Sequence, residues 1–569
     1  MGGLIIILSL VSSLFLTQPP AEEPAKREFR AVWVASYHNI DWPSKRGLSS
    51  EEQQNEFVQI AKQQKDNGMN ALVVQIRPCG DAFYQSEFSQ WSEWLTGTQG
   101  NPPAPYYDPL SFMVEETHQR NMEFHAWMNP FRAISHDRFS SVSPKHITHQ
   151  KPEWFFKYGP KTFFNPGIPE VRNYLAGIVA EVVRNYDVDG IHFDDYFYPY
   201  RTDNEPIPDQ KTFLKYRGDF TNIDDWRRHN IDLFVKQVAD SIQAIKPHVK
   251  FGISPIGIWR NKAQDPEGSV SQVSHSSYDG LYADVRKWLK EGWIDYVAPQ
   301  LYWSTRHPYA NYSELLPWWA KNSFDRHLYV GHAMFKVKDN QSRYWDNPNQ
   351  LELQLKLKKA HPEVSGSIFY SANSFTNNPY DVNRKLREGD FKFPALIPAM
   401  RWKDSIPPLP PEHLYINQHD FFISLNWEKP APAADGEQPN YYVVYRFAED
   451  EKINMEKSSA IIAVQRDTKL RDQIEDPTKS YTYIVTSVDR LHNESLTSTA
   501  ITVKFDMKTL SLVTRSRNTK IIRDLPELDW VTSRQFYRNF PVIKKKKKNY
   551  RVELRTEYSD KVPYLKLGK

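Results

Sequence analysis

Cysteine is nearly absent from this chain of 569 residues, in which Cys79 is the only one. One thiol cannot close an intramolecular disulfide, so a fold stapled by disulfides is excluded. Cys79 also lies far from the N-terminus, and the first residues therefore supply no cysteine for lipid acylation. With 40% hydrophobic and 25% charged residues, the composition is that of a globular protein with one large domain and one or two smaller domains.

An excess of charge of one sign is also absent, because the net charge is only +4. Binding to nucleic acid requires a strongly positive surface that neutralises phosphates, so no nucleic-acid partner is expected. No group of His, Cys, Asp or Glu residues has the spacing of a metal site, and we expect neither a metal nor another cofactor. Aromatic residues, in contrast, make up 14% of the chain. This content fits carbohydrate binding, although most such residues fill the core of a large domain.

The two ends of the chain differ in composition from the middle. The apolar run Leu4 to Leu16 precedes a polar, proline-rich segment, as in a signal peptide, and is too short to span a bilayer comfortably. We expect residues 1–21 to be a signal peptide and the protein to be exported to the periplasm or cell envelope. Residues 506–569 form a basic tail. Its run Lys544 to Lys548 could touch anionic envelope polymers, but such runs are more often simply solvated.

Between these ends, short apolar strands alternate with helices over residues 28–393. The predicted strands are 29–36, 70–77, 123–128, 190–193, 250–254, 294–301, 327–331 and 366–371. Helix-start signals lie between them, such as the capping box Ser49 to Glu52 and the pair Asp108 and Pro109. Eight strand–helix units predict a (β/α)8 TIM barrel. An open doubly wound sheet is the alternative, and it is disfavoured because no glycine-rich phosphate loop follows the first strand.

The fourth predicted strand ends on two adjacent acids, Asp194 and Asp195, and aromatic residues follow as far as Tyr200. Chemistry in TIM barrels takes place where the strands end. Carboxylates beside aromatic rings suit a sugar, whose hydroxyls bind carboxylates and whose C–H faces stack on rings. Asp194 and Asp195 are therefore the predicted catalytic pair of a glycoside hydrolase. The alternative is that acids at a strand end only cap a helix or face solvent.

Predicted strands five to eight end on no Asp or Glu, which constrains the mechanism. A glycosidase normally uses two carboxyl groups, roughly 5 Å apart for retention or about 6.5–9.5 Å apart for inversion. The second group must then be the neighbouring Asp or a loop acid such as Asp41 or Asp81. A third route applies to 2-acetamido sugars: one Asp orients the acetamide, which attacks the anomeric carbon, while the other protonates the leaving oxygen. We favour Asp195 as acid/base and Asp194 as its partner, and the reverse order remains open.

Polar and aromatic groups at the ends of strands two, three, four and six are the predicted substrate-binding residues. They are Gln75, Arg77, Trp127, Asn129, His192, Tyr196, Gln300, Tyr302 and Trp303. His192 could instead be a satisfied core histidine, and Arg77 could form a structural ion pair. Gln300 is the strongest candidate for binding, because an amide flanked by aromatic rings suits a hydroxyl and a stacked sugar.

Six segments of the predicted barrel together resemble the glycosyl-hydrolase-10-like family (YngK/DigH type) of bacterial envelope proteins. They are Phe29 to Ser36, Asn39 to Ser44, Gln75 to Pro78, Ala126 to Pro130, Asp189 to Tyr196 and Ala298 to Trp303. The resemblance implies a TIM barrel, export and action on glycan strands, with peptidoglycan stripped of its stem peptides as the implied substrate. It also places Asp194 and Asp195 at the acidic positions of the family motif. This chain lacks the lipoprotein cysteine that several relatives carry.

A proline-rich stretch, residues 394–411, predicts an extended linker. Residues 412–505 then show short alternating strands and resemble a fibronectin type III sandwich. Such a domain would serve as a spacer or as a docking module for an envelope protein partner. An alternative function for the whole chain is a non-catalytic carbohydrate-binding or scaffold protein that keeps the aromatic cleft.

Overall fold

The structure, a computed structural model, describes residues 24–201, 205–338, 344–419, 422–449, 451–474, 476–506 and 511–517. These residues all belong to one compact unit. The predicted signal peptide and the run Lys544 to Lys548 lie outside the described residues. Among the residues described, no helix combines the length and the apolar character that crossing a bilayer requires.

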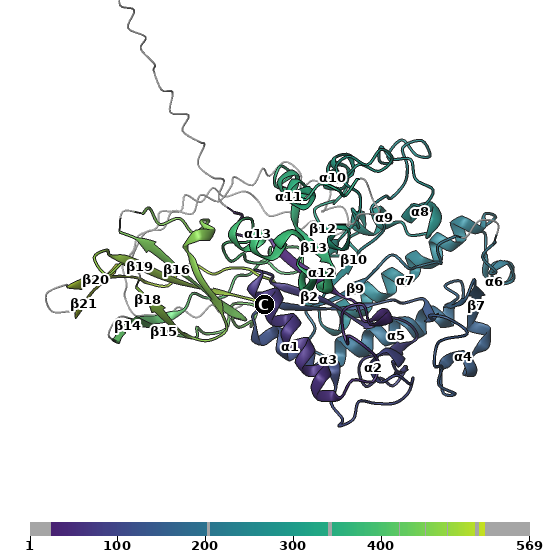
Figure 1. Cartoon of the computed structure of the whole chain (residues 1–569), viewed down its shortest axis with the longest axis horizontal. Helices are drawn as coiled ribbons and strands as arrows, with labels where there is room; N and C mark the ends of the chain where they lie inside the picture. Colours follow the sequence, from purple (N-terminus) through teal and green to yellow (C-terminus); the bar gives the residue numbers. More distant parts are fainter. Residues whose placement is uncertain are drawn as a thin grey trace, which may run out of the picture. The chain divides into compact units, whose positions relative to one another are not determined.

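Eight parallel strands close into a barrel in the order β1-β13-β12-β11-β10-β9-β5-β2 (Figure 1). Their bounds are β1 Phe29–Val34, β2 Ala71–Arg77, β5 Glu123–Met128, β9 Gly190–Phe193, β10 Lys250–Ile253, β11 Tyr296–Val297, β12 His327–Ala333 and β13 Val364–Tyr370. The predicted TIM barrel is therefore confirmed, and the doubly wound open sheet is excluded.

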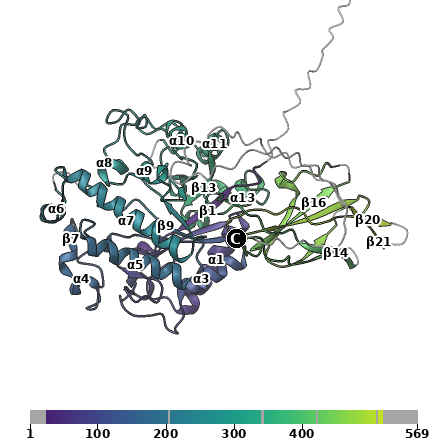
Figure 2. The ribbon, with the colours of Figure 1, turned by 180° about the vertical axis from the view of Figure 1, so that it is seen from behind.

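Helices follow the strands and lie around them in both ribbon views (Figures 1 and 2). The principal ones are α1 Ser50–Asp66, α3 Pro109–Gln119, α5 Pro169–Asn185, α7 Ile223–Ile245, α9 Val285–Lys290, α10 Tyr312–Lys321, α11 Gln350–Lys359 and α13 Val382–Glu388. The predicted capping box is confirmed, because the Ser49 side chain accepts from the Glu52 N–H and Glu52 accepts from the Ser49 N–H. Asp108 likewise caps α3, with Pro109 in its first turn.

Short elements in the loops complete the barrel domain. They are α2 Glu93–Thr96, α4 Ile147–Gln150, α6 Gln210–Tyr216, α8 Ser277–Gly280 and α12 Ala372–Asn377, and the strands β3 Asp81–Ala82, β4 Gln90–Trp91, β6 Arg132–Ile134, β7 Phe155–Tyr158 and β8 Lys161–Phe164. The sixth barrel strand is shorter than its predicted range 294–301, and Pro299, which has no N–H to donate, lies beyond its end. The Asp284 side chain caps α9 at its first turn, where it accepts from the Lys287 N–H.

The barrel interior is filled by side chains and contains a polar layer. Adding a Cβ to Gly252 would place it 1.9 Å from the ring of Tyr296, so glycine makes room for this tyrosine inside the barrel. The Tyr296 hydroxyl contacts His125 Nδ1 at 2.8 Å and His192 Nδ1 at 2.9 Å. Because each buried polar group has a partner, this layer avoids the cost of unsatisfied groups and forms a closed floor beneath the mouth.

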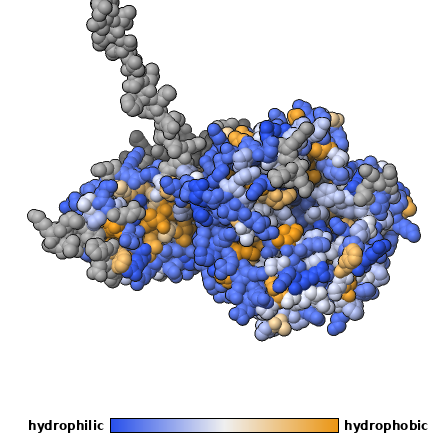
Figure 3. All heavy atoms as spheres, in the orientation of Figure 1, coloured by the Kyte–Doolittle hydropathy of each residue, from blue (hydrophilic) through white to orange (hydrophobic). Residues whose placement is uncertain are grey.

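The C-terminal part forms two antiparallel sheets that share a core (Figure 1). One contains β14 Glu412–His419, β15 Phe422–Glu428 and β18 Lys469–Gln473; the other contains β17 Ile461–Gln465, β16 Tyr441–Ala448, β19 Tyr481–Val488, β20 Ala500–Asp506 and β21 Ser511–Arg517. Strand β21 pairs with β20, so regular structure continues beyond residue 506, where the tail was expected to begin. Figure 3 shows apolar side chains gathered over these sheets and a mostly hydrophilic barrel surface in the same view.

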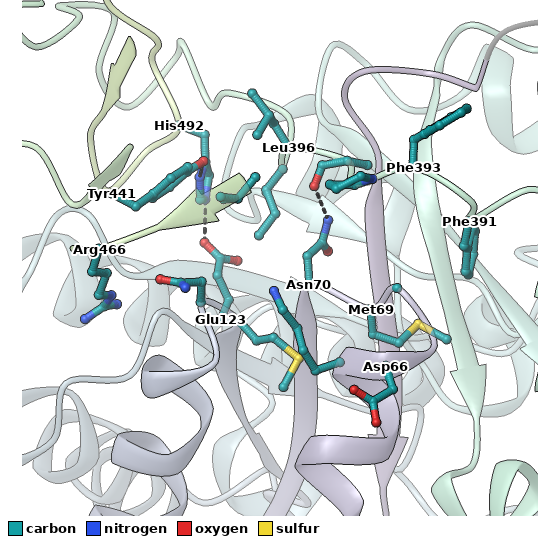
Figure 4. A pocket seen from close by; sticks show the side chains of 18 of the residues that line it. Asp66, Met69, Asn70, Glu123, Phe391, Phe393, Leu396, Tyr441, Arg466 and His492 are labelled. Carbon is teal, nitrogen blue, oxygen red and sulfur yellow. Dashed lines mark hydrogen bonds and ion pairs between the residues drawn. The ribbon is translucent and has the colours of Figure 1, made fainter. Parts of the chain in front are cut away.

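The linker and the C-terminal sheets pack against the base of the barrel, where the strands begin. Leu396 of the linker is buried, and its backbone exchanges hydrogen bonds of 2.8 Å with Lys26 and Glu28. Figure 4 shows the cavity of about 350 Å³ that remains there, with Glu123 and His492 on its wall. Glu123 Oε1 lies 2.6 Å from His492 Nε2 and also contacts Lys250 Nζ. The base is therefore tied to the C-terminal sheets by buried charged groups.

Candidate functional site

The fourth barrel strand, β9, carries the two acids into the C-terminal mouth. Its four residues are fully buried, as expected of a central parallel strand, and the carboxylates of Asp194 and Asp195 follow at once. Both aspartates are only 4% exposed. Neither forms a salt bridge among the described residues, so burial is not offset by an ion pair. The alternative that the two acids only face solvent is thereby excluded.

Asp194 is surrounded by N–H donors. Trp127 Nε1 donates to Asp194 Oδ2 at 3.2 Å, and the Tyr196 N–H donates to Oδ1 at 3.3 Å. With the Asn129 amide nitrogen turned toward Asp194, Asn129 donates to this carboxylate, and its oxygen accepts from Gln75 Nε2 and Arg132 Nη1, each at 3.2 Å. We assign this amide orientation because it gives every group in the network a partner. The donors favour negative charge on Asp194.

Asp195 has a different set of partners. The Tyr200 hydroxyl donates to Asp195 Oδ2, and Gln300 Nε2 donates to Oδ1 at 3.3 Å. The same Gln300 nitrogen also donates to the Ser254 carbonyl at 2.9 Å, which holds the amide in place. Two neighbouring carboxylates thus receive different hydrogen bonds, and this difference lets them take different chemical roles.

Burial and mutual repulsion raise the pKa of both acids. For Asp194 the largest cause is burial, followed by the charge of Asp195, and its pKa is raised although Arg132 and hydrogen bonds oppose the shift. Burial also raises the pKa of Asp195, against the hydrogen bonds from Tyr200 and Gln300. Like charges at close range keep one proton on such a pair at neutral pH. The mouth therefore holds a general acid beside a carboxylate.

Aromatic rings form the walls of the mouth. The guanidinium of Arg132 lies between two half-buried rings, 4.5 Å from the centroid of Tyr37 and 4.2 Å from that of Tyr196. On the other side, half-buried Tyr302 lies near Phe335 and Tyr370, with centroid distances of 5.7 and 6.3 Å. Rings that are partly exposed beside buried carboxylates can stack on a sugar.

Two of the predicted binding residues lie beneath the mouth. His192 is fully buried and contacts Trp33, Tyr296 and Ser254, and burial holds its pKa well below the usual range. Its side chain belongs to the barrel floor, so the core alternative describes it better than substrate contact does. Gln75, which is 1% exposed, accepts hydrogen bonds from the N–H groups of Ser36 and Tyr37 and positions the loop after β1.

Arg77 is another residue whose predicted roles need correction. It is 1% exposed, and its Nη1 donates to the Asn129 carbonyl at 3.0 Å. It therefore supports the loop after β5, and within the described chain it does not form the structural ion pair that was the alternative to substrate binding. Trp303 remains half-buried, and its ring packs over Gly257, where a Cβ would lie 2.9 Å from it.

The two loop acids considered as a second carboxylate are both engaged elsewhere. Asp41 accepts from the Ala35 N–H, the Ser371 hydroxyl and the Asn373 N–H, each at 2.7 Å, and so joins the ends of β1 and β13. Burial raises its pKa to about 6. Asp81 is 1% exposed and accepts from the Glu93 N–H and from Gln99. Asp194 and Asp195 therefore remain the central acids of the mouth.

Three residues of the mouth were not among the predicted site residues. Tyr200 follows the acidic pair closely, but nothing in the sequence shows that its hydroxyl turns back to Asp195. Arg132 follows the third predicted strand by a few residues, and only the structure places it between two rings beside Asp194. Tyr370 ends β13, and its residue type at a strand end was the available signal.

A closed TIM barrel with a buried carboxylate pair and aromatic rings at its C-terminal mouth has the architecture of a glycoside hydrolase. Residues 28–347 match the family described as Glycosyl hydrolase-like 10, and the chain belongs to this family. It is 43% identical over 502 residues to Glycosyl hydrolase YngK of Bacillus subtilis (strain 168), covering 86% of this chain and 97% of that protein. The protein is thus a glycosidase.

Two further comparisons are more distant. Glycosyl hydrolase DigH of Escherichia coli (strain K12) is 35% identical over 396 residues, which cover 65% of this chain and 89% of DigH. Among solved structures, the glycoside hydrolase domain of PgaB (BpsB) from Bordetella bronchiseptica superposes with a TM-score of 0.42 at 13% identity. That match covers 63% of this chain and 98% of the PgaB domain.

Proposed function

We propose that the protein cleaves amino-sugar-containing glycan, namely peptidoglycan strands that lack stem peptides, and that Asp194 and Asp195 are its catalytic residues. One observation carries the proposal: the two acids are buried side by side in the mouth, with N–H donors around Asp194 and a hydroxyl and an amide on Asp195. Strands β10 to β13 end on no acid that could replace either one. A neighbouring pair of this kind suits a sugar that supplies its own nucleophile.

In the proposed mechanism, Asp195 begins protonated and gives its proton to the leaving glycosidic oxygen as the bond to the anomeric carbon breaks. The carbonyl oxygen of the 2-acetamido group forms the new bond to that carbon, and negatively charged Asp194 accepts the acetamide N–H. A water molecule then attacks the anomeric carbon, Asp195 takes the water proton, and the acetamide is released. Tyr200 donates to Asp195 and stabilises the carboxylate that exists between the two steps.

The activity can be tested with sacculi whose stem peptides have been removed by an amidase. We expect the wild-type protein to generate new reducing ends, and Asp194→Asn and Asp195→Asn to generate almost none. Asp240→Asn is the matched control, because Asp240 is exposed and pairs only with Lys236 on α7. Unchanged strands with retained binding would instead support the carbohydrate-binding alternative.

The separate roles of the two acids can be tested with an aryl glycoside of N-acetylglucosamine. Its phenolate leaving group needs little protonation, so Asp195→Asn should keep most of its activity in the first step, whereas Asp194→Asn should lose it. A thiazoline analogue of the sugar, which mimics the cyclised acetamide, should inhibit the wild-type protein. Absence of inhibition would exclude the acetamide-assisted route.

We further propose export to the periplasm or cell envelope, with residues 1–21 as a signal peptide. The apolar run Leu4 to Leu16 supports this proposal. The C-terminal sheets would form a fibronectin type III-like domain that docks an envelope protein, which is supported by two antiparallel sheets around a core containing Trp427. N-terminal sequencing of protein recovered from the envelope fraction checks the signal peptide.

A further inference from the structure

Three acids from distant parts of the chain meet at the joint between the linker and the C-terminal sheets. Asp404 belongs to the linker, Glu437 to the loop between β15 and β16, and Asp489 follows β19. One carboxylate oxygen of each lies within 4.8 Å of the others. Their separation in sequence hides the cluster from any search for spaced ligands.

Asp489 is the buried member of this acidic cluster. It is 1% exposed, and its Oδ1 accepts hydrogen bonds of 2.9 Å from the N–H groups of Leu491 and Asn493. These bonds fix the carboxylate in the turn, while its Oδ2 has no partner in the described part of the chain. A buried carboxylate oxygen without a partner is costly, and a ligand at this position would satisfy it.

The basic side chains beside the acidic cluster are engaged elsewhere. Arg490 donates to both carboxylate oxygens of Asp187 at 2.7 Å, and Lys403 contacts Asp295 at 3.1 Å. Within the described ranges, none of the three acids has an ion pair with a Lys or Arg side chain. Arg490 acts on Glu437 through its charge, but its guanidinium is paired with Asp187, so the three carboxylates converge without a direct protein ion pair.

We propose that Asp404, Glu437 and Asp489 bind a Ca²⁺ ion. The donors are all oxygens, which calcium prefers, whereas structural zinc sites use Cys and His. Two oxygens that bind one Ca²⁺ at about 2.4 Å lie at most about 4.8 Å apart, and the three carboxylate oxygens satisfy this limit. Mg²⁺ usually keeps several waters and binds only one or two carboxylates, so a set of three suits it less well.

The position of the site indicates a structural role. Asn493 Nδ2 donates to Asp404 Oδ2 at 3.0 Å, so the linker and the turn after β19 already touch. The same turn carries His492, which contacts Glu123 at the base of the barrel. An ion bound to Asp404, Glu437 and Asp489 would fix this turn, and with it the contact between the C-terminal sheets and the barrel.

The test measures thermal unfolding of the full-length protein after removal of metal with a chelator. We expect Ca²⁺ to raise the Tm by several degrees, Mg²⁺ to raise it less, and NaCl at matched ionic strength to leave it unchanged. Titration calorimetry should show one Ca²⁺ bound per chain. No calcium-dependent shift in the wild-type protein would overturn the proposal, and an equal shift with Mg²⁺ would overturn the assignment to calcium.

Glu437→Gln is the decisive variant, because no hydrogen bond of its carboxylate supports the described fold. It should bind Ca²⁺ at least roughly tenfold more weakly, since affinity follows the charge of the ligands. Without calcium, the Tm of Glu437→Gln should equal or exceed that of the wild type, because one repelling charge is gone. With calcium, the Tm of this variant should be lower than that of the wild type. Asp489→Asn, which retains Oδ1 for the turn, should behave alike. Glu412→Gln, an exposed acid on β14, should respond to calcium as the wild type does; if Glu437→Gln does so too, the site is refuted.

Discussion

Both ends of the barrel hold buried acids, but the pKa values of these acids are shifted in opposite directions. At the base, Glu123 is 5% exposed; burial alone would raise its pKa, but the charge of Lys250 and the contacts with His492 and His125 hold that pKa well below the usual range. At the mouth, Asp194 and Asp195 are 4% exposed, and burial raises the pKa of each. Similar exposure therefore gives opposite shifts, depending on whether cations lie within contact distance. The base uses its acid to hold domains together, whereas the mouth keeps a proton available for chemistry.

Replacing Asp195, the proposed proton donor at the mouth, should have the strongest effect on activity. Asp195→Asn should lower kcat/KM on amidase-treated sacculi by about 10³- to 10⁴-fold, because protonation of the leaving group is lost. The Tm should change little, since Asn replaces a protonated, uncharged carboxyl group of nearly the same shape. A variant that loses both activity and stability would show that Asp195 is a structural residue like Glu123.

Substitutions at the base of the barrel should lower the stability of the protein and not its catalytic activity. Lys250→Met leaves Glu123 buried without its main cation, and we expect a loss of about 3–5 kcal/mol in the free energy of unfolding. Urea denaturation measures this loss. Lys236→Met, at an exposed pair on α7, is the control and should change stability by less than about 1 kcal/mol. Equal losses in both variants would contradict the contrast between the two ends.

The pH dependence of stability should come from the base. Burial alone would raise the pKa of Glu28, but the charges of Lys358 and Arg30 lower it to about 2 from 4.5. Because the folded pKa is depressed, the contribution is complete above the unfolded value near 4.5 and disappears as the pH falls toward 2. It amounts to about 3 kcal/mol. Glu28→Gln should flatten the stability profile in this acidic range, measured by denaturation at successive pH values.

A smaller effect is expected at the mouth when the hydrogen bond from Tyr200 to Asp195 is removed. Tyr200→Phe removes a hydrogen bond that opposes the rise in the pKa of Asp195, so that pKa should rise further. If Asp195 is the acid, the alkaline limb of the kcat/KM profile should move to higher pH, with a loss of activity of roughly tenfold at the optimum. A limb that stays in place would assign the titration to another group.

The alternation of strands and helices was predictable because parallel barrel strands are continuous apolar runs. In addition, Ser49 and Asp108 are N-cap residues, which mark the start of a helix in the sequence. The acidic pair was predictable because a strand end places its next residues in the mouth. The hydrogen-bond partners of Asp195 were not predictable, because Tyr200 turns back to it and Gln300 comes from the end of another strand. The position of His192 in the barrel floor was not predictable either, because it depends on contacts with Trp33, Tyr296 and Ser254.

The eight strand–helix units, the position of Asp194 and Asp195 after the fourth strand and the start of the C-terminal sheets could be predicted from the sequence, because periodicity and capping depend on neighbouring residues. The acids whose pKa is raised, those paired with cations and those that converge at the joint became known only from the folded chain. A pKa depends on burial and on charges brought together from distant segments, as at Glu123 and His492, and no local pattern carries that information.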